Sequence, residues 1–197
     1  MATTVPAPRG QAAPYPPTPS QTVGPFYGYA LPFTGGGDIA PAGHPATVTV
    51  HGYVYDGAGA PVPDAVIETW QAAPDGSLAG LPGSLRRDPV TGGFLGRNGV
   101  DFTGFGRVAT DADGHWAVRT LAPPAGAPYL CVCVFARGLM HHLYTRAYFT
   151  DGVTDPALAA LPDERRATLL ARSGEDGTRR FDIRLQGERE TVFLDFR

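Results

Sequence analysis

The residues best suited to metal or covalent chemistry lie between positions 129 and 142. Cys131 and Cys133 are the only two cysteines, and they stand two positions apart in an apolar segment with the character of a strand. On a strand their side chains point to one face without ordinary disulfide geometry, and a zinc site needs two further ligands. We therefore expect reduced, buried thiols.

Two other groups of polar residues suggest metal sites, and both have simpler interpretations. His141 and His142 are adjacent, so on a strand they face opposite sides and cannot both reach one metal ion without a bulge. Asp111 and Asp113 could belong to a calcium loop, but the bidentate glutamate of an EF-hand is missing because position 122 is Ala. We interpret the aspartates as part of a turn.

Motifs for hydrolysis and nucleotide binding are absent from the sequence. It contains no G-x-S-x-G nucleophile elbow, no P-loop and no dinucleotide-binding fingerprint. Chemistry must therefore come from another arrangement, if this chain carries any.

The elements that position these residues are predicted to be mainly strands. Residues 47–55 alternate between apolar and polar side chains, which is the period of a half-buried strand. An Asp-Gly turn separates two further alternating segments, and proline followed by acidic residues predicts a helix that begins at Pro162. The expected strands are 47–55, 65–72, 106–110, 115–121, 129–137, 143–149, 181–186 and 191–196, the expected helix is 162–171, and 74–103 is a long excursion with little periodicity.

Length and composition are typical of one globular domain rich in turns. The chain has 197 residues, 43% of them hydrophobic, with 26 glycines and 20 prolines. Residues 1–17 are interpreted as a flexible Pro-rich leader, and residues 18–197 as a single domain. Short strands with frequent turn signals and one short helix predict an all-β fold, an antiparallel β-sandwich with long loops.

Charge and hydropathy argue against two classes of partner. All 16 basic residues are arginines and the net charge is -3, so no basic field for nucleic acid is expected. The longest apolar stretch, 129–136, is too short to span a bilayer, and the first residues do not resemble a signal peptide. We expect a cytoplasmic protein without a membrane or nucleic-acid partner.

An ordered set of segments resembles the intradiol ring-cleaving dioxygenases over 18–196. The segments are TPSQTVGPF, HGYVYDGAGAPVPDAVIETWQA, FGRVATDADGHWAVRTLAP, VFARGLMHHLYTRAYF and RFDIRLQGERETVFLDF. Among these enzymes the chain is most similar to the alpha subunits of the members that cleave protocatechuate. The resemblance implies a β-sandwich and a reaction of an aromatic diol with O2 at a non-haem Fe(III) site.

The ligand positions of catalytic members carry other residues in this chain. In those members, two tyrosines and a His-x-His pair hold iron. The two histidines can bind one ion because residues i and i+2 of a strand share a face. Here Tyr129 and Cys131 stand at the histidine positions, Leu78 at the first tyrosine, and only 124–127 (PAGA) at the second. The resemblance thus implies an alpha subunit without iron, which completes the cleft of a homologous beta subunit that holds Fe(III).

Four residues are implied to contact substrate. Thr22, Gly24 and Pro25 resemble the alpha-subunit stretch that lines the pocket, and Arg137 resembles the arginine that faces it. A guanidinium can complement the carboxylate of protocatechuate, and Gly24 lets backbone approach a flat ring. From the residues alone, Arg137 is expected in a surface or intersubunit salt bridge, and the resemblance favours the pocket.

Two alternatives for the whole chain stay open. One is a β-sandwich binding module without catalysis. The other is a self-sufficient dioxygenase for catechol or hydroxyquinol, which the missing ligands disfavour.

Overall fold

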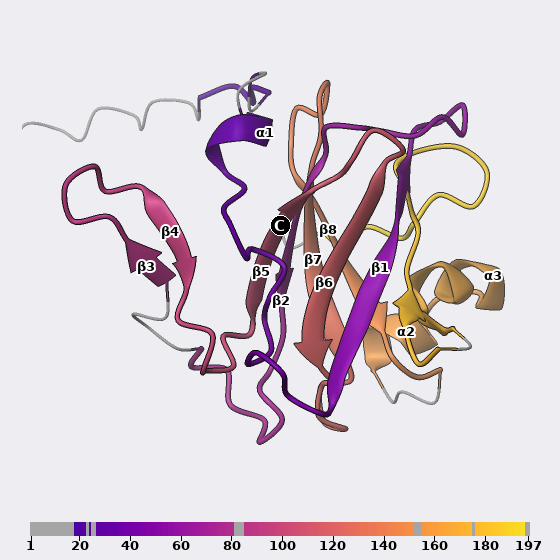
Figure 1. Cartoon of the computed structure of the whole chain (residues 1–197). Coiled ribbons are helices and arrows are strands. Elements are labelled where there is room, and N and C mark those ends of the chain that lie inside the picture. The colour runs from indigo at the N-terminus through magenta and orange to yellow at the C-terminus, as the bar shows by residue number, and fades with distance from the viewer. Residues whose placement is uncertain are drawn as a thin grey trace, which may run out of the picture.

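Two β-sheets pack face to face and enclose the core (Figure 1). The computed structural model describes residues 18–22, 24, 27–80, 85–151, 155–174 and 176–195, so the predicted leader 1–17 lies outside the described residues. The strands are β1 (Thr47–Tyr55), β2 (Val66–Trp70), β3 (Leu85–Arg87), β4 (Phe94–Arg97), β5 (Phe105–Ala109), β6 (His115–Leu121), β7 (Tyr129–Phe135), β8 (Leu143–Tyr148), β9 (Arg172–Ser173), β10 (Arg179–Arg180) and β11 (Ile183–Arg184). The helices are α1 (Tyr27–Ala30), α2 (Pro156–Ala159) and α3 (Asp163–Arg166), the last continued by the 3-10 turn η1 (Ala167–Leu169).

The first sheet is built around β1 and the second around β7. β1 pairs with β6 on one side and with β10 and β11 on the other, while the second sheet has the order β5-β2-β7-β8. Every pairing is antiparallel except those of β1 with β10 and β11, which are parallel. Figure 1 shows the β3–β4 hairpin projecting away from the sandwich. The predicted β-sandwich is confirmed.

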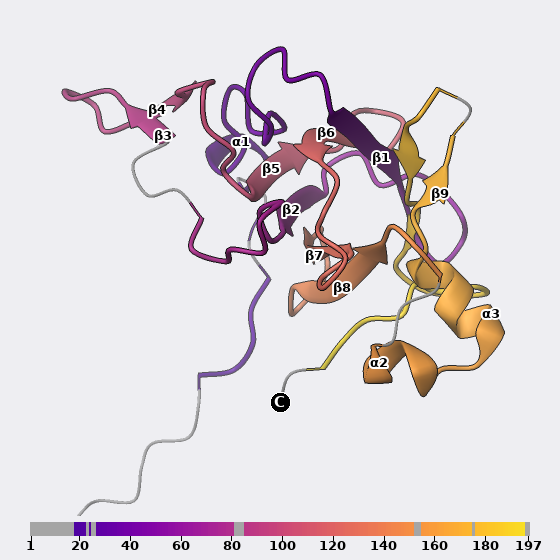
Figure 2. The same cartoon turned by 90° about the horizontal axis from the view of Figure 1, so that it is seen from below.

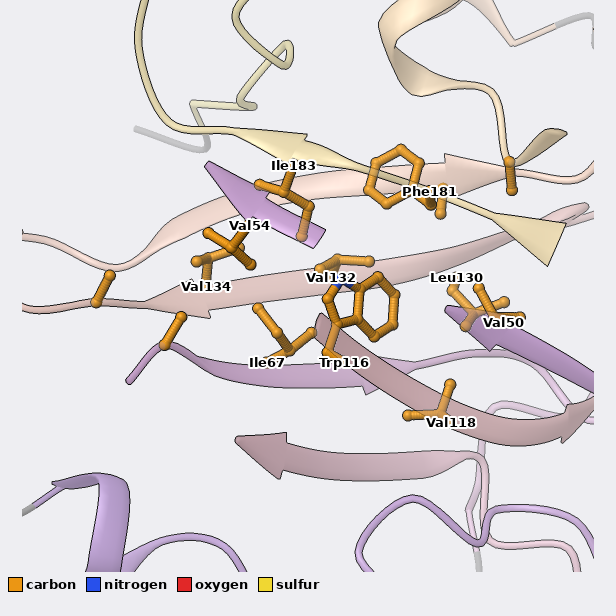
Figure 3. Close-up of a cluster of buried hydrophobic side chains, with 14 of the residues drawn as sticks. Val50, Val54, Ile67, Trp116, Val118, Leu130, Val132, Val134, Phe181 and Ile183 are labelled. Carbon is orange, nitrogen blue, oxygen red and sulfur yellow. The ribbon is translucent and has the colours of Figure 1, made fainter. Parts of the chain in front are cut away.

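Alternating side chains from both sheets form the core, as the period of two predicts. Val50 and Val54 of β1 are fully buried, and they face a second-sheet layer that includes Val132 and Val134 (Figure 3). Gly52 lies between the two valines on β1, where a Cβ atom would overlap the carbonyl oxygen of Phe181. Glycine at this position therefore allows the C-terminal segment to approach β1 closely.

The helical segments differ in detail from the prediction. The helix expected over 162–171 begins at Asp163, and its last turn is a 3-10 turn that ends at Leu169. Two single turns, α1 and α2, were not predicted. Figure 2 shows α2 and α3 together beside β8. No helix within the described ranges is long and apolar enough to cross a membrane.

The last predicted strand, 191–196, is wrong for its described part. Only Leu194 forms a bridge there, with Tyr144, and residues 191–193 belong to no strand. Side chains take up some of the bonds that a strand ladder would make: the Thr145 hydroxyl donates to the Val192 carbonyl, and the Thr191 hydroxyl accepts from the Arg184 amide. Alternation of apolar residues thus reflects burial here without a regular ladder.

The excursion at 74–103 contains the β3–β4 hairpin and is fastened to the sandwich by Arg97. Its guanidinium donates to the carbonyls of Gly35 and Gly36, at 3.0 and 3.1 Å, and lies over the ring of Phe33. Burial lowers the pKa of Arg97, although Asp38 opposes that effect. The hydrogen bonds explain how a long segment with little periodicity remains ordered at its base.

Candidate functional site

The outer face of β7 carries the residues that the sequence singled out. Tyr129, Cys131, Cys133 and Phe135 are half-buried on this face, while the positions between them point into the core. Arg137 follows just beyond the end of β7. At about 3.3 Å per residue, Tyr129 and Arg137 lie about 26 Å apart along the chain direction. Although both residues would share one face of the expected strand 129–137, they therefore do not lie close together.

At the Arg137 end of β7, an ion pair crosses to the start of β2. Arg137 donates from Nε to Oδ2 of Asp64 at 2.7 Å, and Nη2 donates to the same oxygen. The side chains of Arg137 and Asp64 are 74% and 29% exposed. The surface salt bridge expected from the residues alone is thus formed, and its partner is within this chain.

Tyr27 of α1 joins the same junction from the N-terminal segment. Its hydroxyl donates to the backbone carbonyl of Asp64, and the backbone of Arg137 hydrogen-bonds to that hydroxyl. Burial raises the pKa of Tyr27, and the negative charge of Asp64 raises it further, whereas Arg137 lowers it. The ring itself is buried.

The segment that precedes α1 lies along the connection between β7 and β8. The Ser20 hydroxyl lies 3.0 Å from Nε2 of His141, and a pocket of about 230 Å³ is bounded by residues of both segments. Ser20, Gln21, Phe135, Ala136, Leu139, Met140, His141 and His142 line this pocket. His141 and His142 are exposed in this connection and lie on no strand, so the argument from opposite faces of a strand does not apply to them.

Two of the three predicted N-terminal site residues are described, and they lie between these anchors. Thr22 is exposed, and its hydroxyl accepts a 3.4 Å hydrogen bond from the Gly24 amide. Gly24 has a φ of +78°, a left-handed conformation that favours glycine. Pro25 lies outside the described residues. Ser20 and Tyr27, which flank these residues in the sequence, contact His141 and the Asp64–Arg137 junction respectively.

At the Tyr129 end of β7, a second arginine is held by several partners. Cζ of Arg146 lies 4.3 Å from the centre of the Tyr129 ring, and Nη1 donates to Oδ2 of Asp155 at 2.8 Å. The Tyr148 hydroxyl donates to the same oxygen at 2.6 Å. Burial is the main reason that the pKa of Tyr148 is raised to about 12. Here the guanidinium is enclosed by aromatic and acidic groups.

The two cysteines beside this cluster are free thiols, as expected, and they are half-buried where buried side chains were expected. Burial raises the pKa of Cys131, although Arg146 lowers it, and burial raises the pKa of Cys133 to about 12. Both groups are therefore neutral thiols at neutral pH, which are poor metal ligands and poor nucleophiles.

The residues on this face do not fit the ferric ion that the resemblance places there in catalytic members. Tyr129 and Cys131 adjoin the Arg146 cation, and Leu78, at the first tyrosine position, is 68% exposed. A fixed positive charge opposes a trivalent cation, and a leucine supplies no ligand atom. Among the residues that the structure describes, no three His, Cys, Asp or Glu side chains converge into a metal-binding group.

Sequence reasoning missed Asp64, Tyr27 and Arg146. Asp64 was interpreted as part of a turn, and the structure confirms a turn there, just before β2 begins at Val66. Because Val66 pairs with Phe135 of β7, the turns next to these two strand ends meet, and Asp64 pairs with Arg137. This ion pair could be predicted only with the knowledge that β2 and β7 are neighbours.

Known proteins resemble this chain over most of its length. Residues 36–187 match the Dioxygenase_C model, described as dioxygenase. The protocatechuate 3,4-dioxygenase alpha chain of Burkholderia cepacia is 39% identical, over 90% of this chain and 96% of the relative. The alpha chain of the same name from Pseudomonas putida is 36% identical, over 92% of this chain and 97% of the relative.

A solved structure extends the likeness to the fold. The dioxygenase domain of a dioxygenase and carbohydrate-binding protein fusion from Streptomyces sp. SirexAA-E is 26% identical, with a TM-score of 0.51, over 87% of this chain and 99% of that one. The family match includes both sheets, the ion pair at Asp64 and the strand that carries Tyr129 and Cys131. The chain therefore belongs to the intradiol ring-cleaving dioxygenase family.

Proposed function

We propose that this chain is the alpha subunit of a protocatechuate 3,4-dioxygenase and that it works only with a homologous beta chain, which holds the Fe(III). The observation that carries the proposal is the Arg146 cluster. A guanidinium paired with Asp155 occupies the face on which catalytic members hold iron, in a chain whose relatives are named alpha chains over nine-tenths of its length.

The proposed reaction is intradiol cleavage of protocatechuate by O2. The ferric ion of the beta chain supplies the activation of the diol. The ring bond between the two hydroxyl-bearing carbons is broken, and both oxygen atoms of O2 enter the product, 3-carboxy-cis,cis-muconate. The contribution of the present chain is positional, because it completes the cleft, orients the substrate and excludes water.

Arg137 is the residue proposed to face the substrate carboxylate. It is the more exposed partner of its ion pair, and its guanidinium keeps donors that Asp64 does not use. Thr22, Gly24 and Pro25 are proposed to form the adjacent wall. Ser20 contacts His141, and Tyr27 contacts Asp64 and Arg137. These contacts support one shared surface for Thr22, Gly24 and Arg137.

The cytoplasm is the proposed compartment. The chain has two free thiols on one strand, and unpaired cysteines are typical of proteins in reducing compartments. A small aromatic acid and O2 are the proposed substrates, and the proposed assembly is a hetero-oligomer of alpha-beta pairs.

The proposal is tested by co-expressing this chain with a beta chain that carries two tyrosines and a His-x-His pair. We expect the two chains to co-purify, the complex to contain iron and to consume O2 with protocatechuate, and the present chain alone to contain no stoichiometric iron. The measurements are metal analysis, visible absorption and oxygen uptake, with the beta chain alone as the control.

Two results contradict the proposal. One equivalent of tightly held iron with tyrosinate-to-ferric colour in the chain alone favours a self-sufficient enzyme. A well-behaved monomer that ignores the beta chain favours a binding module.

A further inference from the structure

We propose that Asp64 is a positioning residue for substrate recognition: its carboxylate fixes the plane of the Arg137 guanidinium, and its backbone carbonyl fixes Tyr27 at the end of the segment that carries Thr22 and Gly24. The inference rests on the proposed function, because it assigns Asp64 a role in the cleft that Arg137 serves.

Asp64 and Arg137 lie in two turns at the same end of the β2–β7 pair. Val66 of β2 pairs with Phe135 of β7, and each turn begins within two residues of that pair. The paired strand ends therefore bring the two turns together, and the carboxylate of Asp64 meets the guanidinium of Arg137 there.

The hydrogen bonds orient the guanidinium without using all of it. Nε and Nη2 of Arg137 donate to one oxygen, Oδ2 of Asp64. Because the guanidinium is planar, two bonds to one side define its plane. Within the described part of the chain, no hydrogen bond involves Nη1 of Arg137. The edge that includes Nη1 is therefore oriented and available to a carboxylate.

Tyr27 joins the second part of the proposed cleft to the same point. Its buried hydroxyl lies between the Asp64 carbonyl, to which it donates, and the Arg137 backbone. Gly24 precedes Tyr27 by three positions. Asp64 thus connects Arg137 with Tyr27, two residues that are separated by more than a hundred positions in the sequence.

Stability does not account for this arrangement. Arg137 is 74% exposed, and exposed ion pairs contribute little to folding because water and salt screen them. The negative charge of Asp64 also repels a substrate carboxylate weakly through the same screening. The entropy saved by holding the guanidinium in place outweighs that repulsion, because an arginine without this ion pair must lose its rotamer freedom when substrate binds.

The test uses the assembled alpha-beta enzyme with Asp64→Ala and Asp64→Asn, and measures KM and kcat for protocatechuate and for catechol, which lacks the carboxylate. We expect Asp64→Ala to raise the KM for protocatechuate about tenfold, with kcat changed by less than about twofold. Asp64→Asn keeps an acceptor oxygen for Arg137, so its KM is expected within about threefold of the wild type. Catechol kinetics are expected to stay within about twofold for both variants, since catechol offers Arg137 no carboxylate.

Arg137→Ala in the same enzyme separates failure of the inference from failure of the proposed function. If Arg137→Ala raises the KM for protocatechuate and Asp64→Ala does not, the positioning role is overturned and the proposed function stands. A lower KM in Asp64→Ala overturns it too, because Asp64 then competes with substrate for the guanidinium. Equal losses for both substrates indicate a merely structural role. If Arg137→Ala has no effect on protocatechuate, the proposed cleft and the inference fail together.

Discussion

Two arginine–aspartate pairs lie at opposite ends of β7, and they differ in how much of each guanidinium they enclose. Arg146 and Asp155 have side chains that are 23% and 16% exposed, and Tyr129 and Tyr148 cover the pair. Arg137 and Asp64 are 74% and 29% exposed, and Asp64 contacts only Nε and Nη2 of the arginine. The same two residue types thus form a closed cluster at one end and an open one at the other.

The difference separates a structural role from a recognition role. A guanidinium that is stacked on an aromatic ring and paired inside the fold can stabilise the fold, but its enclosure leaves it hardly accessible to a ligand. A guanidinium that is paired along one edge and exposed to solvent contributes little to the stability of the fold, and its other edge can still bind an anion. We therefore expect the two ends of β7 to respond differently to matched substitutions.

The largest expected effect is on stability at the closed end. Arg146→Met keeps the apolar stem and removes the positive charge that hydrogen-bonds to Asp155 in this largely buried site. We expect the free energy of unfolding to fall by about 2 to 4 kcal/mol, somewhat below the cost for a fully buried pair. Arg137→Met is the matched control at the open end and is expected to cost no more than about 1 kcal/mol. Denaturant unfolding of both variants measures the two losses of stability, and equal losses would contradict the expected difference between the two ends of β7.

A smaller effect is expected on catalysis at the open end. If Arg137 makes a charge-assisted hydrogen bond to the substrate carboxylate, Arg137→Ala in the assembled enzyme costs about 1.5 to 3 kcal/mol. This is roughly a ten- to hundredfold loss in kcat/KM for protocatechuate, with a smaller loss for catechol. Steady-state oxygen uptake with the two substrates checks this expectation. Arg146→Met should change kcat/KM for both substrates in the same proportion. A larger loss for protocatechuate than for catechol in that variant would contradict the roles assigned to the two ends of β7.

The smallest effect concerns pH at the closed end. The pKa of Tyr148 is raised to about 12, mainly by burial, from an ordinary value of 10.0. The folded state thus holds the proton more tightly than the unfolded state does, so the stabilising contribution is complete below pH 10 and is lost as the pH rises toward 12. We expect Tyr148→Phe to lose less stability over this interval than the wild type, measured by urea unfolding at each pH. Parallel curves for the two proteins would show that Tyr148 does not titrate in this way.

Local patterns predicted much of the scaffold. The alternation in β1 correctly placed Val50 and Val54 in the core, because side chains of a strand alternate between its faces regardless of what packs on them. The start of α3 followed from Pro162 and the acidic residues after it. The resemblance also predicted, from residue identity alone, that Tyr129 and Cys131 stand where catalytic members carry histidines.

Partners across the fold were decided only by the tertiary structure. Nothing local connects Asp64 with Arg137 or Arg146 with Asp155, because a long side chain can reach any acidic group that the strand order brings near. The parallel course of β10 and β11 beside β1, and the loss of a ladder over 191–193, likewise depend on which backbone groups meet. The sequence by itself determined which face of a regular strand is buried, since this depends on residue identity and a period of two. Which arginine is enclosed and which stays open depended on strand register and burial, which are properties of the whole fold.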